Sequence, residues 1–182
     1  MDVWLEIRRN GESGAKLLVS EYGDRLFAAA MLLCGDTGDA EDLVFRTLDR
    51  AVRKIDSYRP TGSFFAWLYS ILLNFRRMDA RRRRPATISS DIVDSIPAPP
   101  DAAAGASPGA TADRAAVRDA VLRLPPELRE TVVLRLFEGL DVDEVAAIQR
   151  VPAGTVKSRL HRAKELLRAD LLDSDFNKGD SA

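Results

Sequence analysis

Residues 152–168 read PAGTVKSRLHRAKELLR, and the spacing of their apolar side chains predicts an amphipathic helix. At about 100° per residue, apolar residues spaced by four, three and four fall on one face. These residues are Val156, Leu160, Ala163 and Leu167. The basic side chains project from the other faces. A charge run of this kind is most often only the solvated side of a helix, so the residues around it must decide whether it binds an anion.

The residues before this helix have the pattern of a helix-turn-helix. Asp141 and Glu144 are spaced as in a capping box, with Asp in place of Ser or Thr, and they start a short helix over 144–149. A turn at 150–152 follows. Two short helices joined by a tight turn, the second strongly basic, are the outline of a DNA-binding helix-turn-helix.

Two more helices are expected upstream, beginning at Arg114 and at Pro125-Pro126, with Gly139 able to end the second. Residues 1–84 are also predicted to be helical, because apolar residues recur at intervals of three and four without strand-like alternation. There the predicted helices run over 17–33, 39–55 and 64–84, with Asp39 starting the second and turns at 35–39 and 57–63.

The predicted fold class is therefore all-α, with two small helical domains joined by a linker. The linker, residues 85–113, has five prolines, two glycines, four acidic residues and no basic one. This flexible, acidic, Pro/Ala-rich segment separates a domain at 1–84 from one at 114–172, with a tail at 173–182. The net charge of the whole chain is only −1. However, residues 1–84 carry 15 basic and 12 acidic residues, and residues 114–169 carry 11 basic and 8 acidic residues. Two basic segments diluted by acidic ones fit a nucleic-acid partner.

Several classes of protein are disfavoured by composition. The chain has one cysteine, Cys34, and one histidine, His161, so it cannot form an intramolecular disulfide or a thiolate metal site. There is no phosphate-cradling glycine loop and no convincing cluster of metal-binding acids. We therefore expect no catalytic residue, no cofactor and no metal. The start of the chain lacks a signal-peptide pattern and no apolar run approaches the ~20 residues of a membrane span, which predicts a cytoplasmic protein.

The predicted basic helix has side chains suited to DNA. Arg159 and Arg162 can donate to guanine edges in a major groove, and Lys157 and Ser158 can reach bases or phosphate. Phosphate contacts suit Lys164 and Arg168, while the helix start at Gly154 and Thr155 offers free N–H groups.

A second basic cluster, six arginines between Arg76 and Arg84, follows an aromatic-rich segment. Aromatic side chains beside arginines suit unstacked bases. Tyr58, the loop through Ser63, Phe64 and Asn74 are the candidates for base contacts here, since the other apolar residues of this helix have core-like spacing.

Four segments together resemble the extracytoplasmic-function (ECF) sigma factors of bacterial RNA polymerase. They are DAEDLV (39–44), FFAWLYSILLN followed by arginines (64–84), LPPELRETVVLRLFEGLDVDEVA (124–146) and GTVKSRLHRAKELL (154–167). The resemblance implies a non-enzymatic subunit that binds core RNA polymerase and directs promoter-specific initiation. It also implies control by an anti-sigma factor and contacts to the largest-subunit clamp coiled coil and the flap.

The resemblance assigns roles to individual residues of this sequence. Core polymerase binding falls to the helix with Asp39, Glu41, Asp42 and Leu43. Melting and recognition of the minus-10 element fall to Tyr58, Arg59, Thr61, Ser63, Phe64, Asn74, Arg77 and Arg81. Recognition of the minus-35 element falls to Thr155, Lys157, Ser158, Arg159, Arg162 and Lys164.

Three positions depart from the family pattern. Phe45-Arg46 stands where Gln-Glu is usual, which reverses charge at the expected polymerase contact and predicts altered docking. Gln149-Arg150 replaces the common Leu-Gly in the turn, and a non-glycine there is strained if its φ is positive. Asp141 replaces a Ser or Thr cap, which it can match. The competing interpretation is a stand-alone helix-turn-helix regulator that dimerises and binds duplex DNA without polymerase.

Overall fold

The computed structural model describes residues 2–60, 62–82 and 108–179, and side chains over the same ranges except 108–113 and 173–179. All regular structure within these ranges is helical, which confirms the predicted all-α class. The chain divides into two compact units, one carrying α1 to α4 and the other α5 to α8. Most of the predicted linker, and the predicted site residue Thr61, lie outside the described residues.

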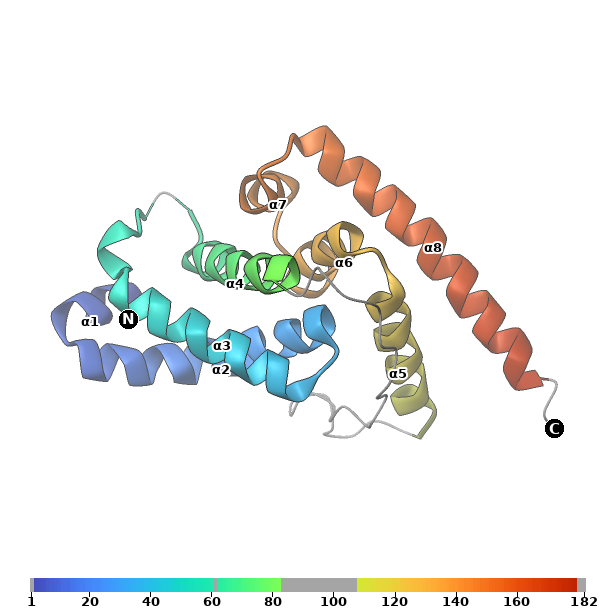
Figure 1. Cartoon of the computed structure of the whole chain (residues 1–182), viewed down its shortest axis with the longest axis horizontal. Helices are drawn as coiled ribbons and strands as arrows, with labels where there is room; N and C mark the ends of the chain where they lie inside the picture. The colour runs from blue at the N-terminus through green and yellow to red at the C-terminus, as the bar shows by residue number, and fades with distance from the viewer. Residues whose placement is uncertain (1, 61, 83–107, 180–182) are drawn as a thin grey trace. The chain divides into compact units, whose positions relative to one another are not determined.

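The described residues of the first unit form four α-helices and one 3₁₀ helix (Figure 1). Their bounds are α1 Val3–Arg9, α2 Gly11–Cys34, α3 Thr37–Arg53, η1 Ile55–Ser57 and α4 Phe64–Arg82. Helix α3 packs along α4, and α1 packs against η1. Leu18 and Leu26 of α2 and Leu68 and Leu72 of α4 are fully buried. Each buried leucine contributes roughly 1.5–3 kcal/mol, so these apolar faces hold the unit together.

The junction between α2 and α3 is shorter than the predicted turn over 35–39. Gly35, at φ 80°, ends α2 in the left-handed region, where glycine carries no steric penalty. Asp36 then caps α3, and its carboxylate accepts a hydrogen bond from the Asp39 N–H at 2.8 Å. The prediction that Asp39 starts the helix is therefore wrong by one turn, because two nearby acids could each serve as the cap.

An aromatic cluster lies under the loop that joins η1 to α4. The ring of Tyr58 is 5.0 Å from Phe64, 5.4 Å from Trp67 and 5.7 Å from Trp4. The Tyr58 hydroxyl donates to the Gly62 carbonyl at 2.9 Å, and burial raises the pKa of this phenol. These contacts fix both ends of the loop to the body of the unit.

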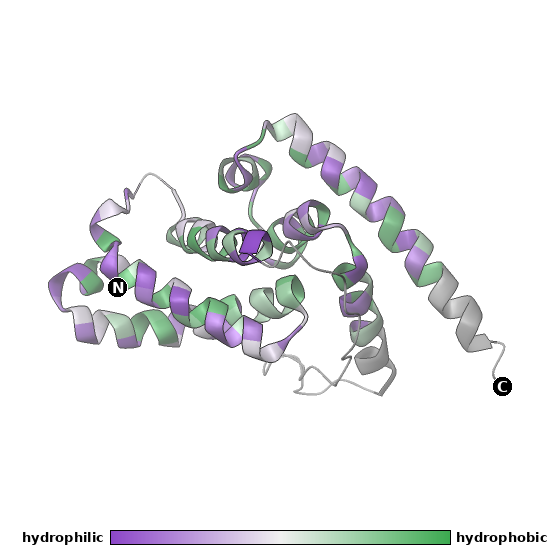
Figure 2. Ribbon diagram, in the orientation of Figure 1, coloured by the Kyte–Doolittle hydropathy of each residue, from purple (hydrophilic) through white to green (hydrophobic). Residues whose placement is uncertain are grey.

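Hydropathy changes sharply along α4. Figure 2 shows the helix hydrophobic over most of its length and hydrophilic at its C-terminal end. This matches the sequence, in which apolar residues up to Phe75 are followed by arginines. The buried half anchors the helix, so the arginine-rich end is held at a defined place on the surface.

Over residues 108–179, the second unit forms four α-helices and one turn of π-helix. Their bounds are α5 Pro108–Arg123, α6 Pro126–Val132, the π-helix η3 Val133–Phe137, α7 Val142–Gln149 and α8 Ala153–Gly179. Helix α5 begins six residues before the predicted start at Arg114. The helix predicted over 127–139 changes to the wider π-helix at Val133, and Gly139, at φ 70°, follows its end as expected.

Helix α8 is the centre of the second unit, because α5, α6 and α7 all pack against it. Val156 and Ala163 of α8 are fully buried, and so are Val121 of α5, Val132 of α6 and Val145 of α7. A bidentate ion pair joins α5 to α8: Arg123 donates to Asp170 from Nη2 to Oδ2 at 2.7 Å and from Nε to Oδ1 at 3.2 Å. The orientation of α8 about its own axis is therefore fixed.

The turn between α7 and α8 depends on one unusual backbone conformation. Arg150 has φ 58° and ψ 48°, and it is the only non-glycine residue with positive φ in the described parts of the chain. Its N–H donates to the carbonyl of Ala147, and the Val151 N–H donates to that of Ala146. The positive φ on which the expected strain depended is present at Arg150, and a side chain in this region costs roughly 1–2 kcal/mol.

We expect Arg150→Gly to stabilise the second unit by about 0.5–1 kcal/mol, because glycine removes the steric penalty but adds freedom to the unfolded chain. Chemical denaturation followed by circular dichroism measures this gain. Arg150→Ala is the control, since it removes the charge and keeps the Cβ atom. An equal gain in both variants would assign the effect to the side chain rather than to the backbone.

Candidate nucleic-acid and polymerase interfaces

Helices α7 and α8 form the predicted helix-turn-helix, and the capping box that starts it is complete. The Asp141 carboxylate accepts from the Glu144 N–H at 2.7 Å, and the Glu144 carboxylate accepts from the Asp141 N–H at 3.0 Å. Two otherwise unpaired donors are satisfied by these bonds. Asp141 therefore caps α7 as a Ser or Thr would.

The predicted base-reading side chains of α8 lie on its solvent-facing sides. Lys157, Ser158, Arg162 and Lys164 are exposed, and so are His161 and Arg168. Thr155 and Arg159 are half-buried, as are Leu160 and Leu167 of the predicted apolar face. The structure thus separates a buried stripe from a basic surface on one helix, which is the arrangement that a groove-binding helix requires.

Arg159 differs from the other predicted readers because it has a partner within the protein. Its Nη1 donates to Oε1 of Gln149 at 2.9 Å, and Gln149 is only 5% exposed. Nothing in the sequence pattern singled out Gln149 except its departure from the usual turn residue. The available signal was that glutamine, a polar residue, stands at position 149, where leucine is usual in the family.

The candidate minus-10 residues divide into a surface group and a buried group. Arg59, Ser63, Asn74 and Arg81 are exposed, and Arg77 is half-buried. The Ser63 hydroxyl accepts from the Ala66 N–H at 3.3 Å and so caps α4, while Arg59 donates to the Asp56 carbonyl at 3.1 Å. Because Asn74, Arg77 and Arg81 are spaced by three and four, they share one face of α4.

Three predicted contact residues are core residues in this structure. Tyr58, Phe64 and Leu43 are only 4%, 8% and 2% exposed. Their aromatic or aliphatic character attracted the assignment, but the same character drives burial. Tyr58 and Phe64 pack against each other beside the loop, and Leu43 is buried on the inner face of α3. None of these side chains is therefore available to a partner in this conformation.

The exposed face of α3 carries an apolar residue among carboxylates. Phe45 is 73% exposed, and the exposed acids Glu41 and Asp49 lie one helical turn before and after it. An aromatic side chain left this open in a small folded unit is a candidate contact. The sequence showed that Phe45 was unusual, but its exposure required the packed structure.

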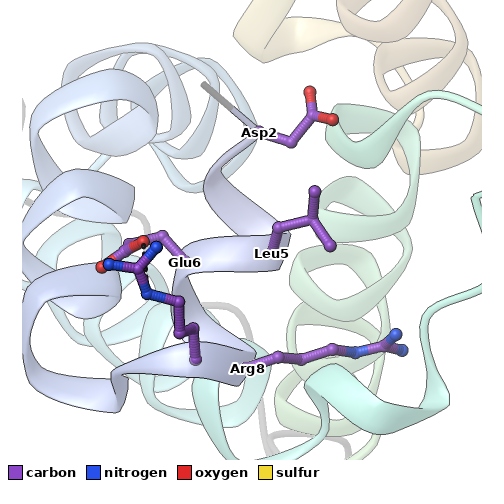
Figure 3. A pocket seen from close by; sticks show the side chains of 5 residues that line it. Asp2, Leu5, Glu6 and Arg8 are labelled. Atoms are coloured by element: carbon purple, nitrogen blue, oxygen red, sulfur yellow. Dashed lines mark ion pairs between the residues drawn. The ribbon is translucent and has the colours of Figure 1, made fainter.

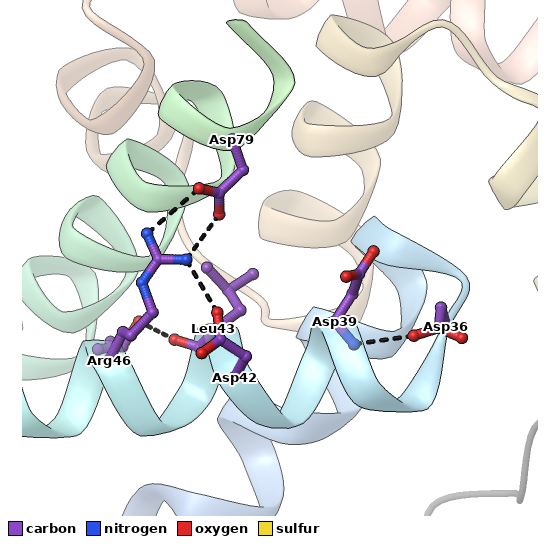
Figure 4. Close-up of polar contacts among 7 residues, drawn as sticks. Asp36, Asp39, Asp42, Leu43, Arg46 and Asp79 are labelled. Carbon is purple, nitrogen blue, oxygen red and sulfur yellow. Dashed lines mark hydrogen bonds and ion pairs between the residues drawn. The ribbon is translucent and has the colours of Figure 1, made fainter. Parts of the chain in front are cut away.

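The charge reversal expected at Arg46 is compensated within the protein. Arg46 donates to Asp79 of α4 at 2.8 and 3.3 Å and to Asp42 at 2.9 Å (Figure 4). Its guanidinium also lies 4.5 Å from the centre of the Phe75 ring. The hydrogen bonds to Asp79 and Asp42 raise the pKa of Arg46 above its usual value. Arg46 therefore ties α3 to α4 rather than adding an uncompensated positive charge to the α3 surface.

A hollow beside α1 is lined by residues that none of these interfaces uses: Asp2, Leu5, Glu6, Arg8 and Arg9 (Figure 3). Arg9 pairs with Glu6 at 4.0 Å, and Arg8 donates to the carbonyls of Ile55 and Tyr58 at 3.2 Å. The hollow thus has mixed charge and serves the packing of α1. The described residues contain no group of three or more His, Cys, Asp or Glu side chains that could hold a metal ion. Nor does any described helix have the length and apolar composition needed to cross a membrane.

Both units match regions of known transcription factors. Residues 18–85 match the family Sigma-70 region 2, and residues 114–167 match the family Sigma-70, region 4. The first match covers α3, α4 and most of α2, and the second covers the helix-turn-helix. Both surfaces described above fall within these matches.

Whole-chain relatives agree with the regional matches. The ECF RNA polymerase sigma-E factor of Escherichia coli is 34% identical over 172 residues, covering 88% of each chain. SigW of Bacillus subtilis is 28% identical over 92% of this chain and 94% of its own length. SigE of Mycolicibacterium smegmatis is 36% identical over 91% of this chain, which spans 64% of its length. The chain belongs to the ECF RNA polymerase sigma factors, which are DNA-binding regulators of transcription rather than enzymes.

Two solved structures resemble the chain in fold. The sigma factor RpoE from Bartonella quintana, in complex with the anti-sigma factor NepR, gives a TM-score of 0.70 at 29% identity over 86% of this chain and 95% of that one. CnrH, in complex with the cytosolic domain of CnrY, gives 0.68 at 26% identity over 95% and 96%. The chain is therefore similar in fold to both structures, one of which is a sigma factor bound to an anti-sigma factor.

We expect Asp79→Asn to destabilise the first unit by about 1–2 kcal/mol, because it breaks an ion pair whose side chains are only 28% and 29% exposed. Asp49→Asn is a matched control, since it breaks the more exposed pair with Arg53 and should cost at most about 0.5 kcal/mol. Urea denaturation of both variants gives the comparison. Equal effects would mean that the pair between α3 and α4 adds no more than a surface pair.

Proposed function

We propose that this chain directs promoter-specific initiation by reading the minus-35 element with α8 and opening the minus-10 element with the α4 surface. The observation that carries the proposal is the row of exposed basic side chains on α8. This helix follows the capped helix α7 and a tight turn in the sequence. A buried stripe fixes this row in one orientation, as direct readout of base edges requires. The predicted division into domains at 1–84 and 114–172, with 85–113 as linker, is part of the proposal.

At the minus-35 element, α8 is proposed to enter the major groove. Arg159 and Arg162 are one turn apart and donate to base edges, with Ser158 and Lys157 beside them. Lys164 and Thr155 contact phosphates; Thr155 does so through its side chain, since its N–H donates to the Pro152 carbonyl at 2.9 Å. The helix thus combines sequence-specific and sequence-independent contacts.

At the minus-10 element, the basic face of α4 is proposed to hold the separated non-template strand. Asn74, Arg77 and Arg81 supply hydrogen bonds and charge from one face, and Arg59 and Ser63 supply them from the loop. Flipping a base out of the duplex costs a few kcal/mol. A surface already held in place by the buried Tyr58 and Phe64 offsets that cost without being reorganised.

Docking on core polymerase is assigned to the exposed face of α3. Phe45 is the apolar centre of this face, and Glu41 and Asp49 give it an acidic rim, so the partner surface should be apolar with a basic rim. Asp42 contributes through its pair with Arg46, and Asp39 lies in the first turn of the helix. The clamp coiled coil of the largest subunit and the flap are the partners that the family resemblance implies.

Regulation by an anti-sigma factor is part of the proposal. The RpoE structure contains the anti-sigma factor NepR, and the CnrH structure contains the cytosolic domain of CnrY. A comparable inhibitor would cover the surfaces that bind polymerase or DNA. We place this chain in the cytoplasm, where polymerase and promoter DNA are found.

Transcription assays with purified core polymerase and a library of random promoters test this proposal. The chain should confer initiation at a shared pair of elements that core polymerase alone does not use. Failure to bind core polymerase would overturn the proposal. Binding to duplex DNA as a dimer without polymerase would support the stand-alone regulator instead.

We expect Phe45→Ala to weaken binding to core polymerase about 10- to 30-fold, equivalent to about 1.4–2 kcal/mol, as for a central apolar contact. Fluorescence titration of labelled chain with core polymerase measures the affinity. Val19→Ala, which changes an exposed apolar residue of α2, is the control and should have no effect. If Phe45→Gln binds better than the unchanged chain, Phe45 hinders docking rather than anchoring it.

We expect Arg162→Ala and Lys164→Ala to affect promoter binding differently. Loss of Arg162 should change base preference in the minus-35 element by about 1–3 kcal/mol. Loss of Lys164 should weaken binding to all sequences and reduce the salt dependence by about one charge. Binding of holoenzyme to a promoter library at several salt concentrations separates the two. Uniform weakening by both would contradict the assignment of Arg162 to a base.

A further inference from the structure

One buried polar side chain joins three helices of the second unit. Gln149, the last residue of α7, contacts Thr131 of α6 and Arg159 of α8. Gln149 and Thr131 are buried, and Arg159 is half-buried at the edge of the basic surface. We call these three residues the Thr131–Gln149–Arg159 hydrogen-bond network. It connects the interior of the unit to one of the proposed base-reading side chains.

The hydrogen bonds of Thr131 determine how the Gln149 amide is oriented. The Thr131 hydroxyl has one proton, and its shortest contact is to the Glu127 carbonyl at 2.6 Å, against 3.2 Å to Oε1 of Gln149. When the Thr131 hydroxyl donates its proton to the Glu127 carbonyl, its oxygen Oγ1 accepts a hydrogen bond from Nε2 of Gln149 at 2.9 Å. The amide oxygen is then directed to Arg159, whose Nη1 donates to it at 2.9 Å.

The backbone at the end of α7 holds the amide in place. Ile148, the residue before Gln149, is buried, and Arg150 after it has the left-handed conformation that ends the helix. Strained residues of this kind persist where the surrounding structure determines them, and they are frequent at functional sites. The anchor for Arg159 is therefore a rigid acceptor.

The guanidinium of Arg159 keeps most of its donors when it is bound to Gln149. Arginine has five N–H donors, and one of them is used on Oε1. The remaining donors include the Nε–Nη2 edge, which matches the two acceptors of a guanine in the major groove. A hydrogen bond to Gln149 is thus compatible with contact to a base.

We propose that Gln149 is a positioning residue that orders Arg159 before DNA binds and so sharpens the base preference at the position that Arg159 reads. This inference rests on the proposed function of α8 as the minus-35 reader. A long side chain fixed in advance loses less freedom on binding, which is equivalent to about 2- to 12-fold in affinity for the specific site. Binding to other sequences does not gain from this order, so the effect is one of specificity.

The experiment uses holoenzyme formed with the full chain and a promoter library randomised at the minus-35 element. Gln149→Leu removes the acceptor and fills the space with an apolar side chain of similar size. We expect it to lower base preference about 2- to 12-fold at one position only, the position that Arg159→Ala also affects. Gln149→Glu keeps an acceptor for Arg159 and should retain the preference.

Two further variants separate positioning from a general structural effect. Ile148→Val makes a small packing change in the same turn and should leave the preference unchanged. In the Arg159→Ala background, Gln149→Leu should have no additional effect, because it acts through Arg159. Denaturation of each variant shows that the unit remains folded.

The possible outcomes distinguish this inference from the proposed function. If the unchanged holoenzyme selects no upstream bases, the proposed function fails and this inference fails with it. If it is selective and Gln149→Leu alters nothing, or alters the preference equally without Arg159, only this inference fails. A change shared by Ile148→Val would also overturn it.

Discussion

Burial of one apolar stripe on α8 determines what the second unit presents to its surroundings. Val156 and Ala163 are fully buried, so α8 cannot rotate about its axis without exposing them. Exposing a residue of the size of valine costs roughly 1.5–3 kcal/mol, and the same rotation would bring lysines and arginines into the core, where an unpaired charge costs far more. The basic row is therefore solvent-facing because the opposite face is committed to packing.

Local polar contacts and one backbone conformation fix the start and the end of α7, the helix before α8. The capping box of Asp141 and Glu144 fixes where α7 starts, and the left-handed Arg150 fixes where it ends. Between them, Gln149 is brought into the interior with a donor and an acceptor that both find partners. The turn is thus a place where backbone strain and a buried amide occur together, as is common at functional sites.

In the first unit, charged side chains are paired across the contact between two helices. Arg46 lies between carboxylates of α3 and α4, so the charges along this contact compensate each other. The aromatic cluster around Tyr58 supports the loop between η1 and α4 without any exposed ring of its own. On α3, Phe45 is the large apolar side chain that is exposed to solvent.

The helical class, the two basic surfaces, the capping box and the unusual turn could be predicted from the amino-acid sequence, because periodicity and capping are local properties of the chain. The sequence could not decide which of two acids three residues apart caps α3, so Asp39 was predicted where Asp36 is the cap. It also could not tell a base-contacting aromatic from a core aromatic, since Tyr58 and Phe64 suit both roles. The pairing of Arg46 with Asp79 and the contact of Arg159 with Gln149 could not be predicted, because each joins two different helices and depends on how those helices pack.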